Sequence, residues 1–295
     1  MKLSNSRRDF ILSLGNVAAV QATAATRGEC FPALASDLVR TAAGYVNPRQ
    51  VLLWESTRKE IREALETGRL KAAIVPTGST EQHNEHLAMI QDTASAVLIA
   101  QQAALELYPQ VTVATPVPVG ISPYWMERKG TLTLRRETFL AVVFDLCDSL
   151  RAHGIKTILI LNGHGGNEKP LKEQMEEFRQ KLDVKVEACS YWEAYAAEGV
   201  RDEVKRLMET GPENVPGHSG EFETSVALAA FPERVHREGV DYEKLKLALK
   251  DPEDARNDRK FYHDSLLARA EKGEVLIRIA VDWVAARLRS MMERS

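Results

Sequence analysis

Hydrophobic residues along the chain follow two different periods. Short continuous apolar runs predict buried strands at residues 71–75, 111–119, 157–161 and 184–191. Longer apolar stretches between them predict helices at residues 92–108, 137–153 and 168–182. Strands that alternate with helices of this length are joined by crossovers and therefore run parallel. The pattern predicts an α/β fold with a layered sheet.

Local signals add detail to this pattern. Thr57 opens a segment with capping-box spacing, so a further helix is predicted to begin there. Pro116 and Pro118 mark the second strand as bent or at an edge of the sheet. The highly charged chain beyond residue 230 is expected to form a solvated helical cap, with helical runs near residues 242–249 and 275–292.

Composition narrows the class of protein. Of the 295 residues, 44% are hydrophobic and 27% are charged, which is typical of a globular protein. The formal net charge of −3 argues against nucleic acid as the main partner, because phosphate-binding surfaces usually carry a basic excess. No apolar run reaches the roughly 20 residues of a membrane span, which excludes a polytopic membrane protein. The three cysteines form no CxxC pair, so no disulfide framework or Cys-rich zinc site is expected.

The N-terminus has the composition of an address signal. Arg7 and Arg8 precede a short apolar stretch, and this pattern resembles a twin-arginine export signal. We expect residues 1–30 to be a signal or a disordered tail, and residues 49–295 to form a single domain with a charged helical C-terminal part. The expected location is periplasmic or exported if the signal is real, and cytoplasmic otherwise.

The loop after the first predicted strand carries Glu81, His83, His86 and Asp92. Carboxylate and imidazole groups this close in sequence suit a borderline divalent ion such as Zn²⁺ or Mn²⁺. Glu81 and His83 can point into one cavity if the segment is extended. Asp92 stands where the next helix begins, so it is either a ligand or simply the N-cap of that helix.

A glycine-rich segment, residues 162–167, follows the most apolar strand and contains His164. Glycines let the backbone turn sharply and pass close to a bound group. The segment lacks the Lys and Ser/Thr of a P-loop, so it does not predict a phosphate site. His164 is better explained as a metal ligand or a base.

A third segment places His218 just before Glu221 and Glu223, at the start of an Ala-rich helix. The two acids alone are explained by the positive end of the helix dipole, but His218 has no such structural explanation. In open α/β sheets, ligands bind beyond the carboxyl ends of the strands. The loops after residues 75, 161 and 191 are therefore expected to share one site, with three aromatic candidates for its walls: Tyr124, Trp125 and Trp192.

Together these segments resemble the signature segments of the creatininase family, in the family's order: residues 78–83, residues 162–164, and His218 with residues 223–225. Residues 130–132 resemble a further loop of that family, and the similarity runs from about residue 50 to about residue 235. The resemblance implies a three-layer α/β/α sandwich with a mostly parallel central sheet. It also implies a metal-dependent amidohydrolase that assembles as a homo-oligomer, a hexamer.

The resemblance further implies roles for individual residues. The residues that match the family's ligands for a two-metal centre, with Asp92 bridging, are Glu81, His83, Asp92 and His164. His218 matches the catalytic histidine and Glu223 the motif glutamate beside it. In such centres the metals activate a shared water and polarise the substrate carbonyl, and His218 would move a proton toward the leaving nitrogen. The expected cofactor is two divalent ions per chain, drawn from Zn, Mn and Fe.

One departure from the family pattern bears on this site. True creatininases carry a Tyr-Glu pair after the motif histidine, and that Glu binds the second metal; here the pair is Gly165-Gly166. Either Glu223 or Glu221 supplies the missing carboxylate, or the second metal is weak or absent. The two glutamates lie about 200° apart on a helix, so only one is expected to face the metals. Glu223 is preferred because it matches the family's glutamate.

The substrate is left open by the sequence. The loss of the tyrosine argues against creatinine, and the Gly-Gly form resembles family members that act on other amides, including formamide-type and peptide-trimming enzymes. The prediction is hydrolysis of a C–N bond, in an amide or cyclic amide of a small molecule, by a metal-activated water. The alternatives are hydrolysis of a C–C or ester bond in a polyol-derived ketone, and a catalytically silent metal- or ligand-binding protein.

Overall fold

A four-stranded parallel sheet lies at the centre of the computed structural model, which describes residues 39–41, 44–238, 240, 244 and 252–294. The strand order is β4-β3-β5-β6. The bounds of the strands are β3 (Ala72–Thr77), β4 (Val111–Val113), β5 (Thr157–Asn162) and β6 (Lys185–Ser190). Thr77, Asn162 and Ser190 stand in register at the carboxyl ends of three neighbouring strands.

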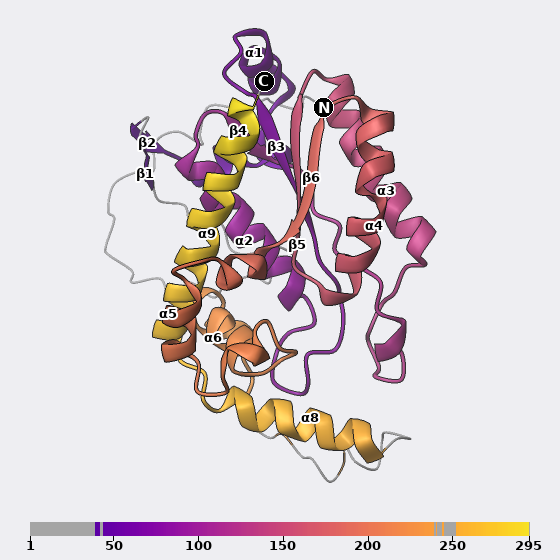
Figure 1. Cartoon of the computed structure of the whole chain (residues 1–295), viewed down its shortest axis with the longest axis vertical. Coiled ribbons are helices and arrows are strands. Elements are labelled where there is room, and N and C mark those ends of the chain that lie inside the picture. Colours follow the sequence, from indigo (N-terminus) through magenta and orange to yellow (C-terminus); the bar gives the residue numbers. More distant parts are fainter. Residues whose placement is uncertain (1–38, 42–43, 239, 241–243, 245–251, 295) are drawn as a thin grey trace, which may run out of the picture. The chain divides into compact units, whose positions relative to one another are not determined.

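Two helical layers cover the sheet, one on each face, as Figure 1 shows. One layer holds α2 (Gln91–Glu106) and α9 (Ala270–Glu293), and the other holds α3 (Arg136–Ala152) and α4 (Gly165–Leu182). Successive residues of a strand pack against opposite helical layers. Ile74 and Leu159 belong to the hydrophobic core on the side of α2 and α9, and Ala73 and Ile158 to the core on the side of α3 and α4. Burial on both faces explains why these strands appear as continuous apolar runs. The predicted three-layer α/β/α sandwich is confirmed.

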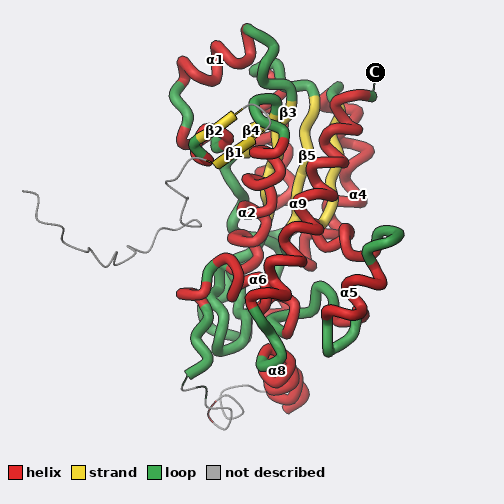
Figure 2. Tube along the Cα trace, turned by 90° about the vertical axis from the view of Figure 1, so that its left-hand side faces the viewer, coloured by secondary structure: helices red, strands yellow, loops and turns green. Residues whose placement is uncertain are grey.

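The remaining elements are short or lie around this sandwich, and Figure 2 shows them as a tube. Thr57 caps α1 through the predicted capping box. The bounds are β1 (Val39–Thr41), β2 (Gly44–Val46), α1 (Arg58–Glu66), α5 (Arg201–Leu207), α6 (Glu221–Ala230) and α8 (Pro252–Ser265). Six 3-10 turns connect them within the described residues: η1 (Pro48–Val51), η2 (Leu53–Glu55), η3 (Pro123–Trp125), η4 (Tyr191–Ala196), η5 (Pro212–Asn214) and η6 (Pro232–Arg234).

Two elements differ from the sequence prediction in ways that shape the site. β4 ends at Val113, because Pro116 and Pro118 have no N–H with which to continue a ladder. The chain then crosses the carboxyl edge of the sheet toward η3. α4 begins at Gly165 rather than at residue 168, with His164 as its N-cap in extended conformation. Residues 165–167 of the glycine-rich segment therefore form the first turn of a helix.

The C-terminal helix also differs from the prediction. The expectation of a solvated cap is wrong for α9, whose Leu276, Val284 and Leu288 are fully buried in the core with α2. α9 also packs closely on α6: a Cβ added at Gly273 would lie only 2.0 Å from the main-chain oxygen of Ser225. None of the helices in the described part of the chain combines the length and apolar character that a bilayer span requires. The expected signal in residues 1–30 lies outside the described residues, as does the expected helix near residues 242–249 except for residue 244.

Candidate active site

The residues singled out in the sequence converge beyond the carboxyl ends of β3 and β5. All five predicted metal ligands are buried there, each less than 8% exposed: Glu81, His83, Asp92, His164 and Glu223. They come from four segments of the chain. The loop after β3 supplies two of them, the first turn of α2 supplies Asp92, the N-cap of α4 is His164, and the first turn of α6 supplies Glu223.

Asp92 is the centre of this cluster. Its Oδ1 lies 2.9 Å from Nε2 of His83, and its Oδ2 lies 2.9 Å from Nδ1 of His164. The alternative that Asp92 is merely the N-cap of the helix is wrong, because the N-cap of α2 is Ile90. One carboxylate thus stands between two imidazoles, with one oxygen facing each.

Ligand atoms that lie within 4.8 Å of one another form three groups among the described residues. Two of the groups share Asp92: one is Glu81, Asp92 and His164, and the other is His83, Asp92 and Glu223. The third consists of Glu81, His83 and His218. This arrangement provides two adjacent sets of mixed oxygen and nitrogen ligands with Asp92 common to both.

The chemistry of these donors fits divalent cations. Oε2 of Glu81 is buried with no hydrogen-bond partner among the described residues, which is costly unless a cation takes its lone pairs. In each histidine, the ring nitrogen that faces away from the cluster lies near a main-chain oxygen. Nδ1 of His83 is 3.1 Å from the main-chain oxygen of Glu81, and Nε2 of His164 is 3.1 Å from the main-chain oxygen of Ile121. Such contacts orient the imidazole and leave its other nitrogen free to bind a metal.

The electrostatics of the cluster also favour positive charge. Burial lowers the pKa of His83, but the carboxylates of Asp92 and Glu223 outweigh it and raise the pKa to about 10. His164 behaves in the same way, because Asp92 and Glu81 raise its pKa to about 10 against burial. Burial, with the repulsion of Asp92 added, raises the pKa of Glu223 to about 8. Without a cation, protons on these groups balance the charge that the carboxylates concentrate.

Glu221 lies outside the three groups formed by the described residues. Its carboxylate accepts hydrogen bonds from the main-chain N–H of Glu209 and of Thr210, at 3.1 and 2.8 Å, and forms an ion pair with Lys272. Oε2 of Glu223 instead lies 3.5 Å from Nε2 of His83 and accepts a hydrogen bond from the main-chain N–H of Ser219 at 2.6 Å. Only Glu223 faces the cluster.

The two glycines after His164 have different surroundings. A Cβ at Gly165 would meet no described atom within 4 Å. A Cβ at Gly166 would lie 2.1 Å from the main-chain oxygen of Ile121 and 2.6 Å from the hydroxyl of Tyr124. A glutamate at position 166 is therefore sterically excluded in this backbone.

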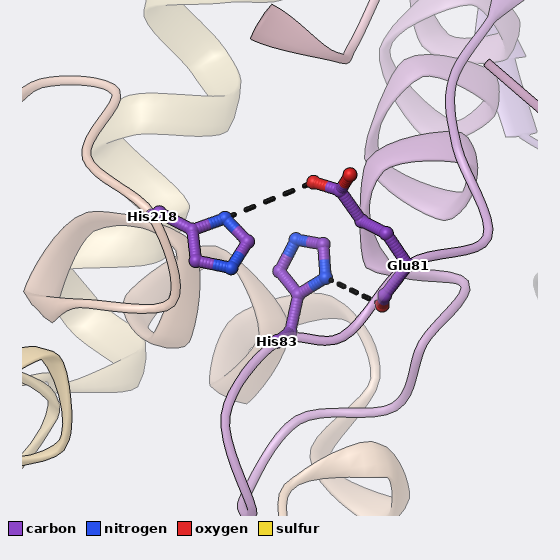
Figure 3. Close-up of side chains that lie close together, drawn as sticks. All are labelled: Glu81, His83 and His218. Atoms are coloured by element: carbon purple, nitrogen blue, oxygen red, sulfur yellow. Dashed lines mark hydrogen bonds and ion pairs between the residues drawn. The ribbon is translucent and has the colours of Figure 1, made fainter. Parts of the chain in front are cut away.

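His218 lies beside the cluster, on the segment that leads into α6. Figure 3 shows its ring next to that of His83, with Nδ1 of His218 facing the Glu81 carboxylate at 3.8 Å. The ring centroids of the two histidines are 4.7 Å apart, and Trp125 stacks on His218 at 4.6 Å. Nε2 of His218 lies 2.8 Å from the amide nitrogen of Gln82. Burial, with the positive charge of His83 added, holds the pKa of His218 well below its usual value.

The aromatic residues proposed as pocket walls divide into two sets. Trp125 covers His218, and the hydroxyl of Tyr124 lies 3.4 Å from Nε2 of His164. Burial raises the pKa of Tyr124, so the phenol stays protonated. The expectation for Trp192 is wrong, because its indole N–H donates to Glu168 at 3.2 Å and its ring packs against the core.

Sequence reasoning missed three polar residues that hold the site together. Asn162 accepts from the main-chain N–H of His164 and donates to its main-chain oxygen, at 3.1 and 2.7 Å. Asn167 donates to the main-chain oxygen of Gly78 and accepts from the N–H of Ile121, both at 3.0 Å. Gln82 contacts His218. The signal available in the sequence was the presence of amide side chains within the segments at residues 78–83 and 162–167, since amides that become buried need several partners.

A family model described as creatinine amidohydrolase matches residues 54–288 of the chain. The chain belongs to the creatininase family. Among solved structures, the crystal structure of a creatinine amidohydrolase aligns with a TM-score of 0.69 at 24% identity, covering 83% of this chain and 99% of that one. A manganese creatininase aligns with a TM-score of 0.68 at 23% identity and the same coverage. At these identities the structural likeness supports the fold, and the creatininase fold expected from the sequence is confirmed.

Curated relatives in the creatininase family carry three different names. The 3-dehydro-scyllo-inosose hydrolase of Thermotoga maritima is 33% identical over 200 residues, which is 66% of this chain and 61% of that protein. The creatinine amidohydrolase of Pseudomonas putida is 26% identical over 264 residues, 82% of this chain and 97% of that protein. A mycofactocin precursor peptide peptidase of Mycobacterium ulcerans is 26% identical over 170 residues, 55% of this chain and 59% of that protein. The matches to the first and third relatives thus span less than two thirds of those proteins.

Proposed function

We propose that this creatininase-family chain is a metal-dependent hydrolase that cleaves the C–N bond of an amide or cyclic amide in a small molecule. The observation that carries the proposal is the position of Asp92, whose two carboxylate oxygens each face a different histidine at 2.9 Å. Two neighbouring ligand sets around one shared carboxylate are the arrangement of a two-metal hydrolytic centre. The hydrolase names of the relatives, two of which are an amidohydrolase and a peptidase, agree with it.

The proposed cofactor is two divalent ions per chain, of Zn, Mn or Fe. One ion would be held by Glu81, Asp92 and His164, and the other by His83, Asp92 and Glu223. Bound there, the ions would lower the pKa of a water molecule and polarise a substrate carbonyl. Glu223 would take the place of the glutamate that true creatininases carry after the motif histidine, at the position where this chain has Gly166 and no room for a side chain.

The role proposed for His218 is proton transfer to the leaving nitrogen. When the amide nitrogen of Gln82 donates to Nε2, the proton of the neutral ring resides on Nδ1, the nitrogen that faces Glu81. Nδ1 is therefore the atom through which His218 would exchange a proton with substrate. Trp125, which stacks on the His218 ring, would limit the access of bulk water to this histidine.

The substrate is proposed to be an amide other than creatinine. Gly165 and Gly166 stand where true creatininases have a tyrosine and a glutamate, so contacts from those side chains are lost. A second candidate, hydrolysis of a C–C or ester bond in a polyol-derived ketone, is favoured by one observation: the 33% identity to an inosose hydrolase.

Metal analysis and substrate screening test the proposal together. Protein reconstituted with Zn²⁺, Mn²⁺ or Fe²⁺ is expected to bind two ions per chain and to hydrolyse members of a panel of cyclic amides, formamides and short peptides. Turnover restricted to polyol-derived ketones would favour the second candidate. Bound metal with no turnover on either panel would indicate a catalytically silent binding protein, and failure to bind any transition metal would contradict the metal centre itself.

Assembly and location are proposed from the sequence resemblances alone. A homo-hexamer is expected, and light scattering on the purified full-length chain tests it. Export by the twin-arginine route is expected, and cell fractionation of the native chain beside an Arg7→Lys, Arg8→Lys variant tests it. If the native chain stays in the cytoplasm, the export signal is wrong.

A further inference from the structure

Helix α8 has no part in the function proposed above, yet it lies against the candidate site. Three of its residues contact segments that carry site residues. Asp258 forms an ion pair with Arg128, Phe261 lies edge-on to His218 with centroids 5.8 Å apart, and Tyr262 lies edge-on to His86 at 5.6 Å. Figures 1 and 2 both place α8 beyond α6, on the side away from the sheet.

The ion pair is the strongest of these contacts. Nε and Nη2 of Arg128 donate to the two carboxylate oxygens of Asp258 at 3.0 and 2.9 Å. The side chains are only 6% and 2% exposed. The main-chain oxygen of Asp258 also accepts a hydrogen bond from the side-chain amide of Asn84, which follows His83. One carboxylate-bearing residue of α8 is thereby bonded to two loops of the site.

Arg128 also contacts Trp125, which in turn contacts His218. Its guanidinium carbon lies 4.5 Å from the centroid of the Trp125 ring, and Trp125 stacks on His218 with centroids 4.6 Å apart and planes 24° apart. His218 is therefore held on one face by Trp125 and at its edge by Phe261, while Gln82 fixes the direction of Nε2. The planar Arg fork matches a carboxylate at two points and can lie flat on an indole, which a lysine cannot do.

Stability alone is a poor explanation for this pair. Burying two opposite charges costs desolvation energy that their attraction often only offsets, and apolar side chains of similar size commonly stabilise a fold as well or better. The two hydrogen bonds to Asp258 fix the plane of the Arg128 guanidinium, and this in turn fixes the position of the Trp125 ring beside it.

We propose that Arg128 and Asp258 are positioning residues for His218, acting through Trp125, so that α8 is a component of the active site. The proposal rests on the function proposed for His218. It assigns α8 a specific role: the helix supplies the carboxylate that orients Arg128, and Arg128 holds the indole that keeps the imidazole turned toward Glu81.

The test uses the full-length chain loaded with Zn²⁺ and labelled with ¹⁵N-histidine. The His218 ring signals are identified by their loss in His218→Gln. Asp258→Asn and Arg128→Lys are expected to shift or broaden these signals while two zinc ions stay bound, and to lower kcat roughly tenfold with little change in KM, since orientation of a reacting group affects the chemical step. Glu173→Gln is the matched control, because it removes an exposed Arg–carboxylate pair, with Arg136 at 2.7 Å, and should change neither readout.

A further variant keeps the proposal testable if Asp258→Asn does not fold. Trp125→Leu leaves the ion pair intact but removes the ring, and it should perturb His218 in the same way. Unchanged His218 signals in these variants would overturn the proposal, as would altered signals with an unchanged kcat. If the native enzyme hydrolyses none of the tested amides, the proposed function fails, and the ring signals alone decide the positioning.

Discussion

Oε2 of Glu223 lies 3.5 Å from Nε2 of His83, although the two residues are 140 positions apart in the chain. The same oxygen accepts the N–H of Ser219, a residue in the left-handed conformation with φ of 49°. Few residues other than glycine and asparagine adopt this backbone conformation without an energetic cost. Glu223 therefore belongs to the ligand cluster and also stabilises the turn that follows His218.

The first prediction separates the two glutamates of α6. Glu223→Gln is expected to lower the metal content from two ions toward one and to reduce kcat about 100-fold, because the second ligand set loses its anionic oxygen. Glu221→Gln should leave both ions bound. Its carboxylate bonds Lys272 and the 209–210 backbone, so the expected effect is a loss of about 1–3 kcal/mol of stability. Elemental analysis and denaturant titration of both variants distinguish the roles, and reversed effects would transfer the ligand role to Glu221.

The second prediction concerns His164. His164→Ala should abolish metal-dependent activity, because Nδ1 of His164 is the one imidazole nitrogen in the described ligand set of Glu81, Asp92 and His164. The fold should survive, since the residue is an N-cap at the edge of the sheet and makes no side-chain cap bond. Circular dichroism and a thermal melt test the fold, and metal analysis tests the site. Unchanged turnover would remove His164 from the centre.

The third prediction compares the adjacent glycines. Gly166→Ala places a Cβ 2.1 Å from a main-chain oxygen and is expected to destabilise the protein by about 1–3 kcal/mol and to weaken metal binding. At position 165 there is open space for the added methyl group, and the backbone is ordinary helix, so Gly165→Ala meets no steric conflict. It should be neutral or stabilise the fold by roughly 0.4–1 kcal/mol. Equal effects of the two substitutions would show that the packing around Tyr124 and Ile121 relaxes freely.

The fourth prediction is a pH dependence of the metal-free protein. The pKa of Glu223 is raised to about 8 from 4.5, and the pKa values of His83 and His164 are raised to about 10 from 6.5. Below about pH 6 the lowered pKa values of His86 and His218 act in the opposite direction. The folded state therefore holds more protons than the unfolded state between about pH 6 and pH 10, and its stability falls as pH rises through this window. Bound metal replaces those protons. Thermal melts of chelated and metal-loaded protein should diverge increasingly from pH 6 to pH 9, and a constant difference would contradict the cluster's electrostatics.

The fifth prediction concerns the N-terminus. Removing residues 1–30 is expected to leave the melting temperature unchanged within error, because their composition is that of an address signal. Differential scanning calorimetry of the shortened and full-length chains provides the comparison. A drop of several degrees would mean that the segment packs on the folded domain.

The sequence predicted the sheet and the meeting of its loops at one site because both follow from local rules. Residues 71–75 and 157–161 are apolar without interruption, and such runs between helices favour parallel strands with both faces buried. Once β3 and β5 are neighbours, the residues that follow them must meet at one edge. The topology thus brings Glu81 and His164 to one site, whereas their role as metal ligands came from the resemblance to the creatininase family.

Long-range pairing accounts for what the sequence did not predict. The preference for Glu223 came from the family resemblance, whereas the contacts of Glu221 depend on Lys272, a residue of α9 that no local pattern connects with α6. The pairing of Arg128 with Asp258 likewise joins residues 130 positions apart, each of which resembles a surface charge in its own segment. α9 was mistaken for a solvated cap because its apolar face is interspersed with charged residues, and only packing reveals which face is buried.

The close contact of α6 with α9 has a consequence for the order of events during synthesis. Gly273 lies against the backbone of Ser225, and Lys272 closes the ion pair with Glu221, so α6 is held in place by the last helix of the chain. A nascent chain that has completed Glu81 through Glu223 still lacks that support until α9 leaves the ribosome. Formation of the proposed metal site is therefore expected to depend on α9, a segment that is synthesised after all of the proposed ligands.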